Sequence, residues 1–275
     1  MKIILSRKGF DSANGGIVSP IMEDGSLITL PIPSKDKDKF EDLSYGEHSY
    51  SDILRDLKYK ADPEYPSCHV DPDLSIDRRK KKIDGWCPVF GQVNSSALYL
   101  RNTVGIQPGD LFLFFGNYHK VKFEDGRFQY VRRSGDFYSD NDLQVIWGYM
   151  QIGRIVTDPK EQKRYSWHPH SSESYVAKEG SNVMFVAREK LSFNDKMSGA
   201  GLLKFRKDRV LTAEGCNKAT WVKRPYYDVD AIIGNRRNAS ANPCGIYYAG
   251  IWQELGLRET VECEEWAKSI VHEID

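Results

Sequence analysis

The chain has 275 residues, of which 40% are hydrophobic and 12% aromatic, and it balances 39 basic against 39 acidic residues. This composition excludes full disorder, and the balanced charge argues against a protein that grips nucleic acid with its whole surface, although a local basic patch is still allowed. No stretch approaches the ~18–20 consecutive apolar residues that a membrane-spanning helix needs.

The cysteines are five in number, scattered, and never spaced as CxxC. We therefore expect neither a disulfide scaffold nor a zinc ribbon, and we expect a reducing compartment. The first residues contain too short an apolar run for a signal peptide, so we expect a cytoplasmic protein. The five are Cys68, Cys87, Cys216, Cys244 and Cys263.

The first third of the chain predicts short strands and one helix. Residues 2–5 form an apolar run typical of a buried strand. Residues 17–21 and 26–32 indicate a hairpin that turns at Asp24-Gly25. Residues 49–59 predict a helix that begins with a capping box, in which Ser49 is followed three residues later by Asp52. Residues 60–92 contain four prolines and little periodicity, and a loop of this length is more often functional than idle.

The middle of the chain predicts a helix followed by the strongest strands. Residues 94–103 favour a helix, and residues 111–115 are typical of a strand that is buried on both faces. Residues 118–130 indicate a hairpin with Asp125-Gly126 at its tip. Residues 144–156 predict a long strand in which Gly148 and Gly153 mark bulges.

Two further elements complete the pattern. Residues 183–187 predict a strand, and residues 260–272 predict a closing helix capped by Thr260. Together the elements indicate an α+β fold with a strand-rich, mainly antiparallel and potentially barrel-like centre and a few peripheral helices. No linker is evident, so we expect one compact domain over residues 1–275.

Two histidine-containing pairs are candidates for a metal site. His69 and Asp71 are two residues apart, as are His168 and His170, and in extended backbone residues two apart point to the same face. Neighbouring prolines favour extended geometry in both segments. Three imidazoles and a carboxylate suit iron, zinc or manganese, and the spacing matches non-haem iron oxygenases with a facial triad. Alternatively, these histidines are hydrogen-bonded polar residues in loops.

Asp73 can serve as a general base beside a metal-bound water, or it can cap the following turn.

A second group of polar residues directly follows the first strand. Its glycines allow close approach to a ligand, and its cations can hold a phosphate, although neither a Walker A loop nor a Rossmann fingerprint is present. This group consists of Arg7, Lys8, Asp11, Ser12, Asn14, Gly15 and Gly16.

Five basic residues in a row form a third candidate. Such a run can neutralise nucleic-acid phosphates, with the aromatics Trp86, Phe90 and Tyr99 stacking on bases. Equally, the run can be a solvated face and the aromatics part of the core. The run consists of Arg78, Arg79, Lys80, Lys81 and Lys82.

Six segments together resemble a known family. They are MKIILSRKGFDSANGGIVSPI, CHVDPDL, the FGQ that ends at Gln92, GDLFLFFG, IWGYMQIG and WHPH, in this order. The chain looks like the nucleotide modification associated domain family, third class, which occurs in phages and bacteria. The resemblance covers nearly the whole chain and implies a role in the modification of bases in DNA or nucleotides, alongside partner enzymes of such a pathway.

A more local likeness concerns residues 104–156, which are similar to barrels of the PUA, ASCH and EVE type. In those barrels a PGD turn feeds one strand and a later strand carries an apolar-glycine pattern. This likeness implies a module that binds nucleic acid and reads modified bases.

The leading hypothesis is a metal-dependent enzyme in base or nucleotide modification. His69, Asp71, His168 and His170 would hold a divalent metal, most plausibly Fe(II) and alternatively zinc or manganese. The reaction would be oxidative or hydrolytic, and any organic co-substrate is left open. Arg7, Lys8 and Ser12 would hold a substrate phosphate, and Asp11 would belong to the same binding loop. Gln92 would hydrogen-bond a base edge, and Trp147 would also contact the substrate.

The competing hypothesis is a non-catalytic reader of modified bases. Trp86, Trp147 and Tyr149 would then form a cage around a flipped base. A third alternative is an assembly partner of a modification complex, without catalysis of its own.

Overall fold

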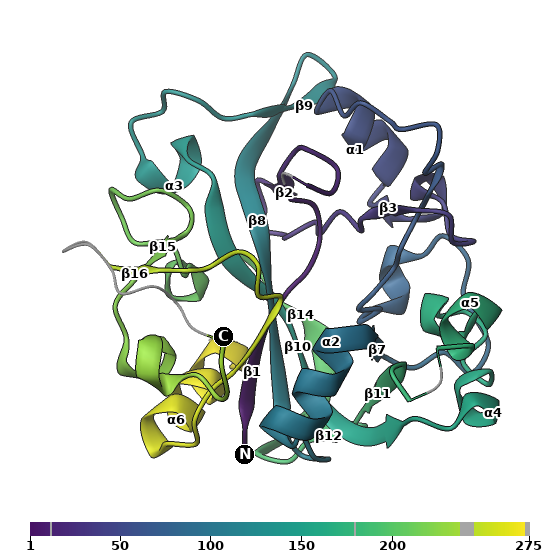
Figure 1. The fold of residues 1–275 in the computed structure, drawn as a ribbon. Coiled ribbons are helices and arrows are strands. Elements are labelled where there is room, and N and C mark those ends of the chain that lie inside the picture. The colour runs from purple at the N-terminus through teal and green to yellow at the C-terminus, as the bar shows by residue number, and fades with distance from the viewer. Residues whose placement is uncertain (12, 179, 237–244, 273–275) are drawn as a thin grey trace.

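The computed structural model describes residues 1–11, 13–178, 180–236 and 245–272. Within these residues a mixed sheet of nine strands runs through the centre of the molecule (Figure 1). Its strands are β1 (Ile3–Arg7), β2 (Ser19–Ile21), β7 (Val89–Gln92), β8 (Leu111–Glu124), β9 (Arg127–Tyr130), β10 (Leu143–Val156), β11 (Val183–Ala187), β14 (Ala200–Leu202) and β17 (Glu254–Gly256). The main path is β17-β1-β8-β10-β11-β7, with β2 and β9 on β8 and β14 on β10.

Short helices and two-stranded ribbons surround this sheet. The helices are α1 (Tyr50–Asp56), α2 (Asn94–Leu98), the π-helical η3 (Tyr99–Val104), α3 (Phe137–Asp140), α4 (Pro159–Gln162), α5 (Glu173–Val176) and α6 (Val261–Val271). The ribbons pair β3 (Pro33–Ser34) with β6 (Ser67–Cys68), β4 (Ser44–Tyr45) with β5 (His48–Ser49), β12 (Lys190–Leu191) with β13 (Asn194–Ser198), and β15 (Thr220–Trp221) with β16 (Ile246–Tyr247). The 3₁₀ turns are η1 (Phe40–Asp42), η2 (Ile76–Arg78), η4 (Pro169–Ser171), η5 (Lys207–Arg209), η6 (Pro225–Tyr227) and η7 (Val229–Ala231). None of the helices in the described ranges has the length and apolar character to span a bilayer.

The central strand β8 is buried on both faces, as its apolar sequence predicts. Phe112 and Phe114 pack into one hydrophobic cluster, whereas Leu113 and Phe115 pack into another on the opposite face. The predicted α+β class and strand-rich centre are confirmed. The sheet is more mixed than expected, because β1 and β2 pair with β8 in parallel, and the nine strands form no closed barrel in the described part of the chain.

Several local predictions are confirmed. The Ser49 side chain accepts a hydrogen bond from the Asp52 amide at the start of α1, and Thr260 does the same for Cys263 at the start of α6. The turn between β8 and β9 has Asp125 and Gly126 at positive φ. β10 carries irregularities in register between Ile146 and Gly148 and between Ile152 and Arg154, which are the two predicted bulges.

Two elements differ from their predicted form. Residues 111–124 are one continuous strand rather than a strand followed by the arm of a hairpin. The predicted hairpin at residues 17–32 shrinks to one bridge between Ile21 and Leu27, and β2 pairs in parallel with β8.

Two segments, the one that follows β6 and turn η4, pack against β7. The backbone of Asp73 exchanges hydrogen bonds of 2.9 and 3.1 Å with Val89, which fixes the segment after β6 against β7. Turn η4 packs over Gly91 of the same strand, because a Cβ built on Gly91 would lie 2.2 Å from Cγ of His170. The two predicted histidine pairs are thereby brought together.

Candidate metal centre

His69 and Asp71 converge, but through a turn rather than extended backbone. The His69 amide donates to the carbonyl of Ile32, and the Asp71 amide donates back to the carbonyl of His69 at 2.9 Å. Nε2 of His69 then lies 3.9 Å from Oδ2 of Asp71. The predicted convergence therefore holds, whereas the local geometry is tighter than predicted.

The second pair also sits in a turn. His168 caps η4, and its Nδ1 accepts the backbone amide of His170 at 3.3 Å. Nε2 of His170 lies 3.8 Å from Oδ2 of Asp71, and Nε2 of His168 lies 3.1 Å from Oδ1. The four side chains predicted to meet are therefore neighbours, arranged on the two oxygens of one carboxylate.

Three of the four form a compact set of donor atoms. One ligand atom each from His69, Asp71 and His170 lies within 4.8 Å of the others. Metal–ligand bonds of about 2.0–2.2 Å hold neighbouring ligand atoms roughly 3–3.5 Å apart. A side-chain shift of less than about 1 Å would therefore close the set around an ion.

His69 and His170 are each hydrogen-bonded through Nδ1, which leaves Nε2 of both rings without a hydrogen bond in the described part of the chain. Nδ1 of His69 lies 2.7 Å from the Asp36 carboxylate, which can only accept. Nδ1 of His170 lies 2.8 Å from Oδ1 of Asn182, whose amide nitrogen donates to the carbonyl of His170 and to Gln162. Because the orientation of Asn182 is fixed in this way, both imidazoles carry their proton on Nδ1 and present a lone pair on Nε2.

The two oxygens of Asp71 have different surroundings. Oδ1 accepts the Gly91 amide at 2.7 Å and faces His168, whereas Oδ2 faces His69 and His170. His168 is 1% exposed, and because its Nδ1 accepts a hydrogen bond, its proton belongs on Nε2, toward Asp71. Nε2 of His168 lies 3.1 Å from Oδ1 but makes no hydrogen bond within the described residues, and His168 is not part of the compact donor set.

The charges suit a cation at this point. Burial by itself would raise the pKa of the Asp71 carboxyl, but contact with His168 and the neighbouring imidazoles hold it well below its usual range. Burial opposes ionisation of Asp36 as well, yet its hydrogen bond with His69 keeps that pKa below the ordinary value. Burial lowers the pKa of His170 to about 3, so its ring is neutral at physiological pH, as a metal ligand must be.

The donor set opens into a cleft of ≈ 210 Å³. Tyr175 of α5 lies at its edge, with its ring 4.4 Å from that of His170 and 5.6 Å from that of His69. Burial raises the pKa of Tyr175 to about 12, so the phenol stays protonated. The remaining lining includes Arg7, Lys8, Asp11, Asn14, Gln92 and Gln253, four of which were predicted as substrate contacts. Ser12, also predicted, lies outside the described residues.

Behind the cleft lies a buried carboxylate that the sequence did not reveal. Glu254 is 0% exposed, and its Oε1 accepts from Lys8 at 3.0 Å and from the side chain of Gln92. Its Oε2 lies 3.5 Å from Arg236. Lys8 and Gln92 are therefore held by Glu254, whereas Arg7 makes a looser 3.4 Å contact with Asp11 and lies over the ring of Tyr248, 5.8 Å from its centroid.

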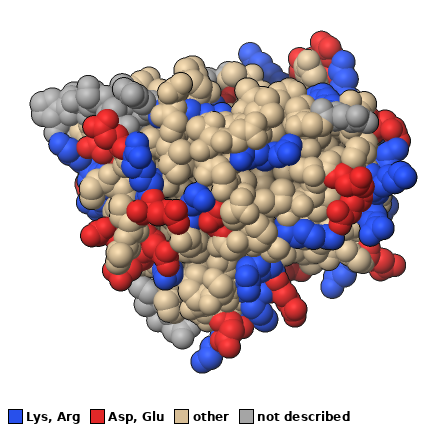
Figure 2. Space-filling model, turned by 60° about the horizontal axis from the view of Figure 1, so that its bottom comes forward, with Lys and Arg blue, Asp and Glu red and all other residues tan. Residues whose placement is uncertain are grey.

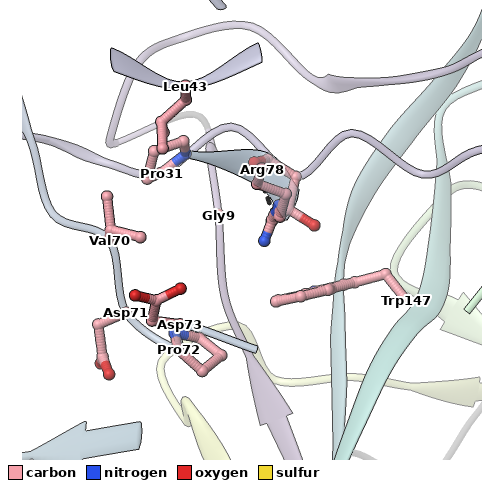
Figure 3. A pocket seen from close by; sticks show the side chains of 10 residues that line it. Gly9, Pro31, Leu43, Val70, Asp71, Pro72, Asp73, Arg78 and Trp147 are labelled. Carbon is pink, nitrogen blue, oxygen red and sulfur yellow. Dashed lines mark hydrogen bonds between the residues drawn. The ribbon is translucent and has the colours of Figure 1, made fainter. Parts of the chain in front are cut away.

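A second, smaller pocket lies on the other side of Asp71. Asp71 and Asp73 line one side of it and face Arg78 and Trp147 across it (Figure 3). Its volume of ≈ 20 Å³ is suited to one water molecule and is too small for a base. Trp147, predicted as a substrate contact, is 1% exposed and borders this pocket rather than the cleft.

Asp73 and the two arginines of the basic run turn inward, whereas the three lysines of the run are exposed. Oδ2 of Asp73 accepts from Arg79 at 3.0 Å and from the Trp86 indole at 2.9 Å, and Asp73 is 2% exposed. Arg78 also turns inward, toward the hydroxyl of Tyr50. Lys80, Lys81 and Lys82 alone are exposed, so the five residues do not form one basic surface.

The aromatic cage of the competing hypothesis is not assembled. Trp147 and Tyr149 lie in different hydrophobic clusters, and Trp86 packs against a third. The residues that sequence reasoning missed are Asp36, Gly91, Tyr175, Asn182 and Glu254. Only Gly91 stood in a motif that had been singled out. Asp36, Asn182 and Glu254 lie 12 or more residues from the side chains of the site that they contact, and Tyr175, five residues after His170, carries no feature that points to a histidine.

The comparisons with known proteins identify the family. The family model for nucleotide modification associated domain 3 matches residues 2–243. No curated protein and no solved structure matches the chain. Since the match covers most of the 275 residues, the chain belongs to the nucleotide modification associated domain 3 family.

Proposed function

We propose that this protein is a metal-dependent enzyme that modifies a nucleotide or a nucleic-acid base. The observation that carries the proposal is the set of three unengaged donor atoms, Nε2 of His69, Oδ2 of Asp71 and Nε2 of His170. The other polar atom of each of these side chains is already bonded within the protein. Such prior orientation is typical of metal ligands.

Two imidazoles and one carboxylate favour ferrous iron, with zinc and manganese as the alternatives. Bound there, iron would supply redox chemistry with dioxygen, whereas zinc would activate water for hydrolysis. Three protein ligands would leave positions open toward the cleft, where a substrate can reach them.

The cleft offers groups for a nucleotide. Arg7 retains donor capacity beyond its contact with Asp11, and the amides of Asn14 and Gln253 line the same wall. The protonated phenol of Tyr175 can donate to a base or sugar near the metal. Lys8, held by Glu254, contributes positive charge and keeps Gln92 in place rather than gripping phosphate itself.

Metal content measured by plasma mass spectrometry tests the proposal, with protein purified without a histidine tag or chelator. We expect near-stoichiometric metal in the wild type and its loss in His69→Ala and His170→Ala. His48→Ala is a matched control, because it removes a histidine that packs against the rings of Phe123 and Phe128 outside the cleft. A wild type that stays empty after anaerobic incubation with Fe(II), Zn(II) and Mn(II) would refute the proposal.

A further inference from the structure

A groove beside the end of α1 has an excess of positive charge. It has a volume of ≈ 450 Å³ and lies between the end of α1 and β9, at the top of the molecule in Figure 1. Three of its lining residues are cations, Lys58, Arg127 and Arg132. The remaining ones are Asp56, Leu57, Gln129 and Tyr130.

The three cations have no carboxylate within ion-pair distance in the described part of the chain. Asp56, the one acidic residue of the groove, is already engaged by the Phe128 amide at 3.1 Å and by Arg55 at 3.6 Å. The groove therefore has an excess of positive charge that its own residues do not balance. The bottom face of the molecule contrasts with it, because basic and acidic side chains stand side by side there (Figure 2).

The backbone at Lys58 supports a role for its charge. Lys58 has a φ of 61°, just after α1, where the Tyr59 amide donates to the carbonyl of Leu54 at 2.9 Å. Glycine is the favoured residue at this position of a helix end, since a side chain is strained there. The sequence thus places a lysine where stability alone would favour glycine.

Contacts connect the segments that line the groove with those that line the cleft. Asp11 and Asn14 line the cleft, and the carbonyl of Val18, a few residues later in the chain, accepts a hydrogen bond of 2.6 Å from Tyr130 in the groove. Phe10, beside Asp11, packs against Tyr59, beside Lys58, with ring centroids 5.3 Å apart. These two contacts link the segments that line the groove to the segment that lines the cleft.

We propose that the groove binds the sugar-phosphate backbone of a nucleic acid, so that the enzyme acts on a base within a polynucleotide rather than on a free nucleotide. The proposal rests on the function proposed above for its site of chemistry. Single-stranded nucleic acid fits best, because a base must leave the duplex stack to reach a buried metal. An acidic peptide would also match the positive charge of the groove, but it has no base to present to the proposed metal site in the cleft.

The test is fluorescence anisotropy with a labelled twelve-nucleotide single-stranded DNA, at several salt concentrations. The triple variant Lys58→Glu, Arg127→Glu, Arg132→Glu should lose at least about tenfold in affinity and reduce the salt slope by about 2, since each phosphate contact on a single strand contributes ~0.7. The matched control is Arg188→Glu, Lys190→Glu, Lys196→Glu, which makes the same change of charge at exposed positions on and just before the β12–β13 ribbon; β12 lies at the bottom of Figure 1. It should bind as the wild type does.

Each other outcome has a definite meaning. Absence of binding by the wild type, or an equal loss in both triple variants, would overturn the proposal. A larger loss in Lys80→Glu, Lys81→Glu, Lys82→Glu would place the nucleic acid on the exposed lysines instead, and would overturn it too. Metal content separates this proposal from the previous one, because the groove variant should keep its metal and a metal-free Asp71→Asn variant should still bind the DNA.

Lys58→Gly gives a readout that a merely structural role would not produce. We expect this variant to unfold at a higher temperature, because the strain at φ 61° is relieved, and yet to bind the DNA more weakly. Unchanged or tighter binding would contradict a role for Lys58 in the groove.

Discussion

A buried histidine lies next to an aspartate at two places in the molecule. The two places differ in how many ring nitrogens are hydrogen-bonded within the protein. His119 of β8 is 2% exposed, and its Nδ1 lies 2.9 Å from Asp142 while its Nε2 lies 2.7 Å from the carbonyl of Val131. His170 is 3% exposed, but only its Nδ1 is bonded within the protein. Residue type and burial are therefore nearly the same at both places.

The difference lies in the number of acceptors around each ring. Both nitrogens of His119 have an oxygen atom within hydrogen-bond distance, so the whole ring is used in structural contacts. His69 and His170 each have one acceptor within hydrogen-bond distance among the described residues. Their second nitrogens lie 3.9 and 3.8 Å from the same oxygen of Asp71, beyond that distance. The proposed metal centre thus differs from the structural pair in the atoms that folding leaves unbonded, and the following predictions test this difference.

Asp71→Asn should produce the largest effect. The amide oxygen can still accept from Gly91, so the fold should persist, but the site loses its one carboxylate ligand. We expect metal affinity to fall by more than about 100-fold, beyond the loss that supporting groups cause. Metal titration followed by calorimetry measures this, with circular dichroism to check the fold. Retention of wild-type affinity would mean that Oδ2 is not a ligand.

Asp36→Leu should have the next largest effect, because it removes the acceptor that orients His69. We expect a loss of about 10- to 100-fold in metal affinity. Asp36→Asn keeps an acceptor and should recover most of it, which distinguishes orientation from simple disruption. The matched change at the other pair, Asp142→Leu, should leave metal affinity unchanged; an equal loss there would erase the contrast between the two places.

Gly91→Ala should disturb the site through packing. The new methyl group would lie 2.2 Å from Cγ of His170, so either the ring or β7 must move. Overpacking of this kind costs about 1–3 kcal/mol of unfolding free energy. Urea denaturation of Gly91→Ala, of His170→Ala and of the double variant forms a cycle in which removal of the ring should relieve the cost. Additive losses would show that Gly91 and His170 do not interact in this way.

The sequence predicted the elements with local signals better than the contacts between them. Ser49, Thr260 and the Asp125-Gly126 turn mark their elements because capping and turn chemistry act over a few residues. The parallel pairing of β1 with β8 joins residues more than 100 positions apart, and nothing in either segment specifies the partner.

The candidate site divides in the same way. His69, Asp71 and His170 could be named because ligand chemistry and short spacing are visible in the sequence. Their supporting groups could not, because Asp36 lies in a polar loop and Asn182 precedes a strand, and neither has a feature that points to a histidine. The separate role of His168 depends on which nitrogen accepts a hydrogen bond, which only the folded turn determines.

Asp142→Asn should have the smallest effect, and a pH-dependent one. The hydrogen bond with His119 holds the pKa of Asp142 below its ordinary value of 3.8, so the folded state binds this proton less readily than the unfolded chain does. The stabilisation is therefore present above about pH 4 and is lost as the pH falls through the lower value of the folded state. Because Asp142 is 42% exposed, solvent and salt screen the pair, and the difference should be small. Urea midpoints of wild type and variant should differ at pH 7 and converge toward pH 3, with unchanged metal content throughout; a loss of metal in this variant would show that the His119 pair is coupled to the centre after all.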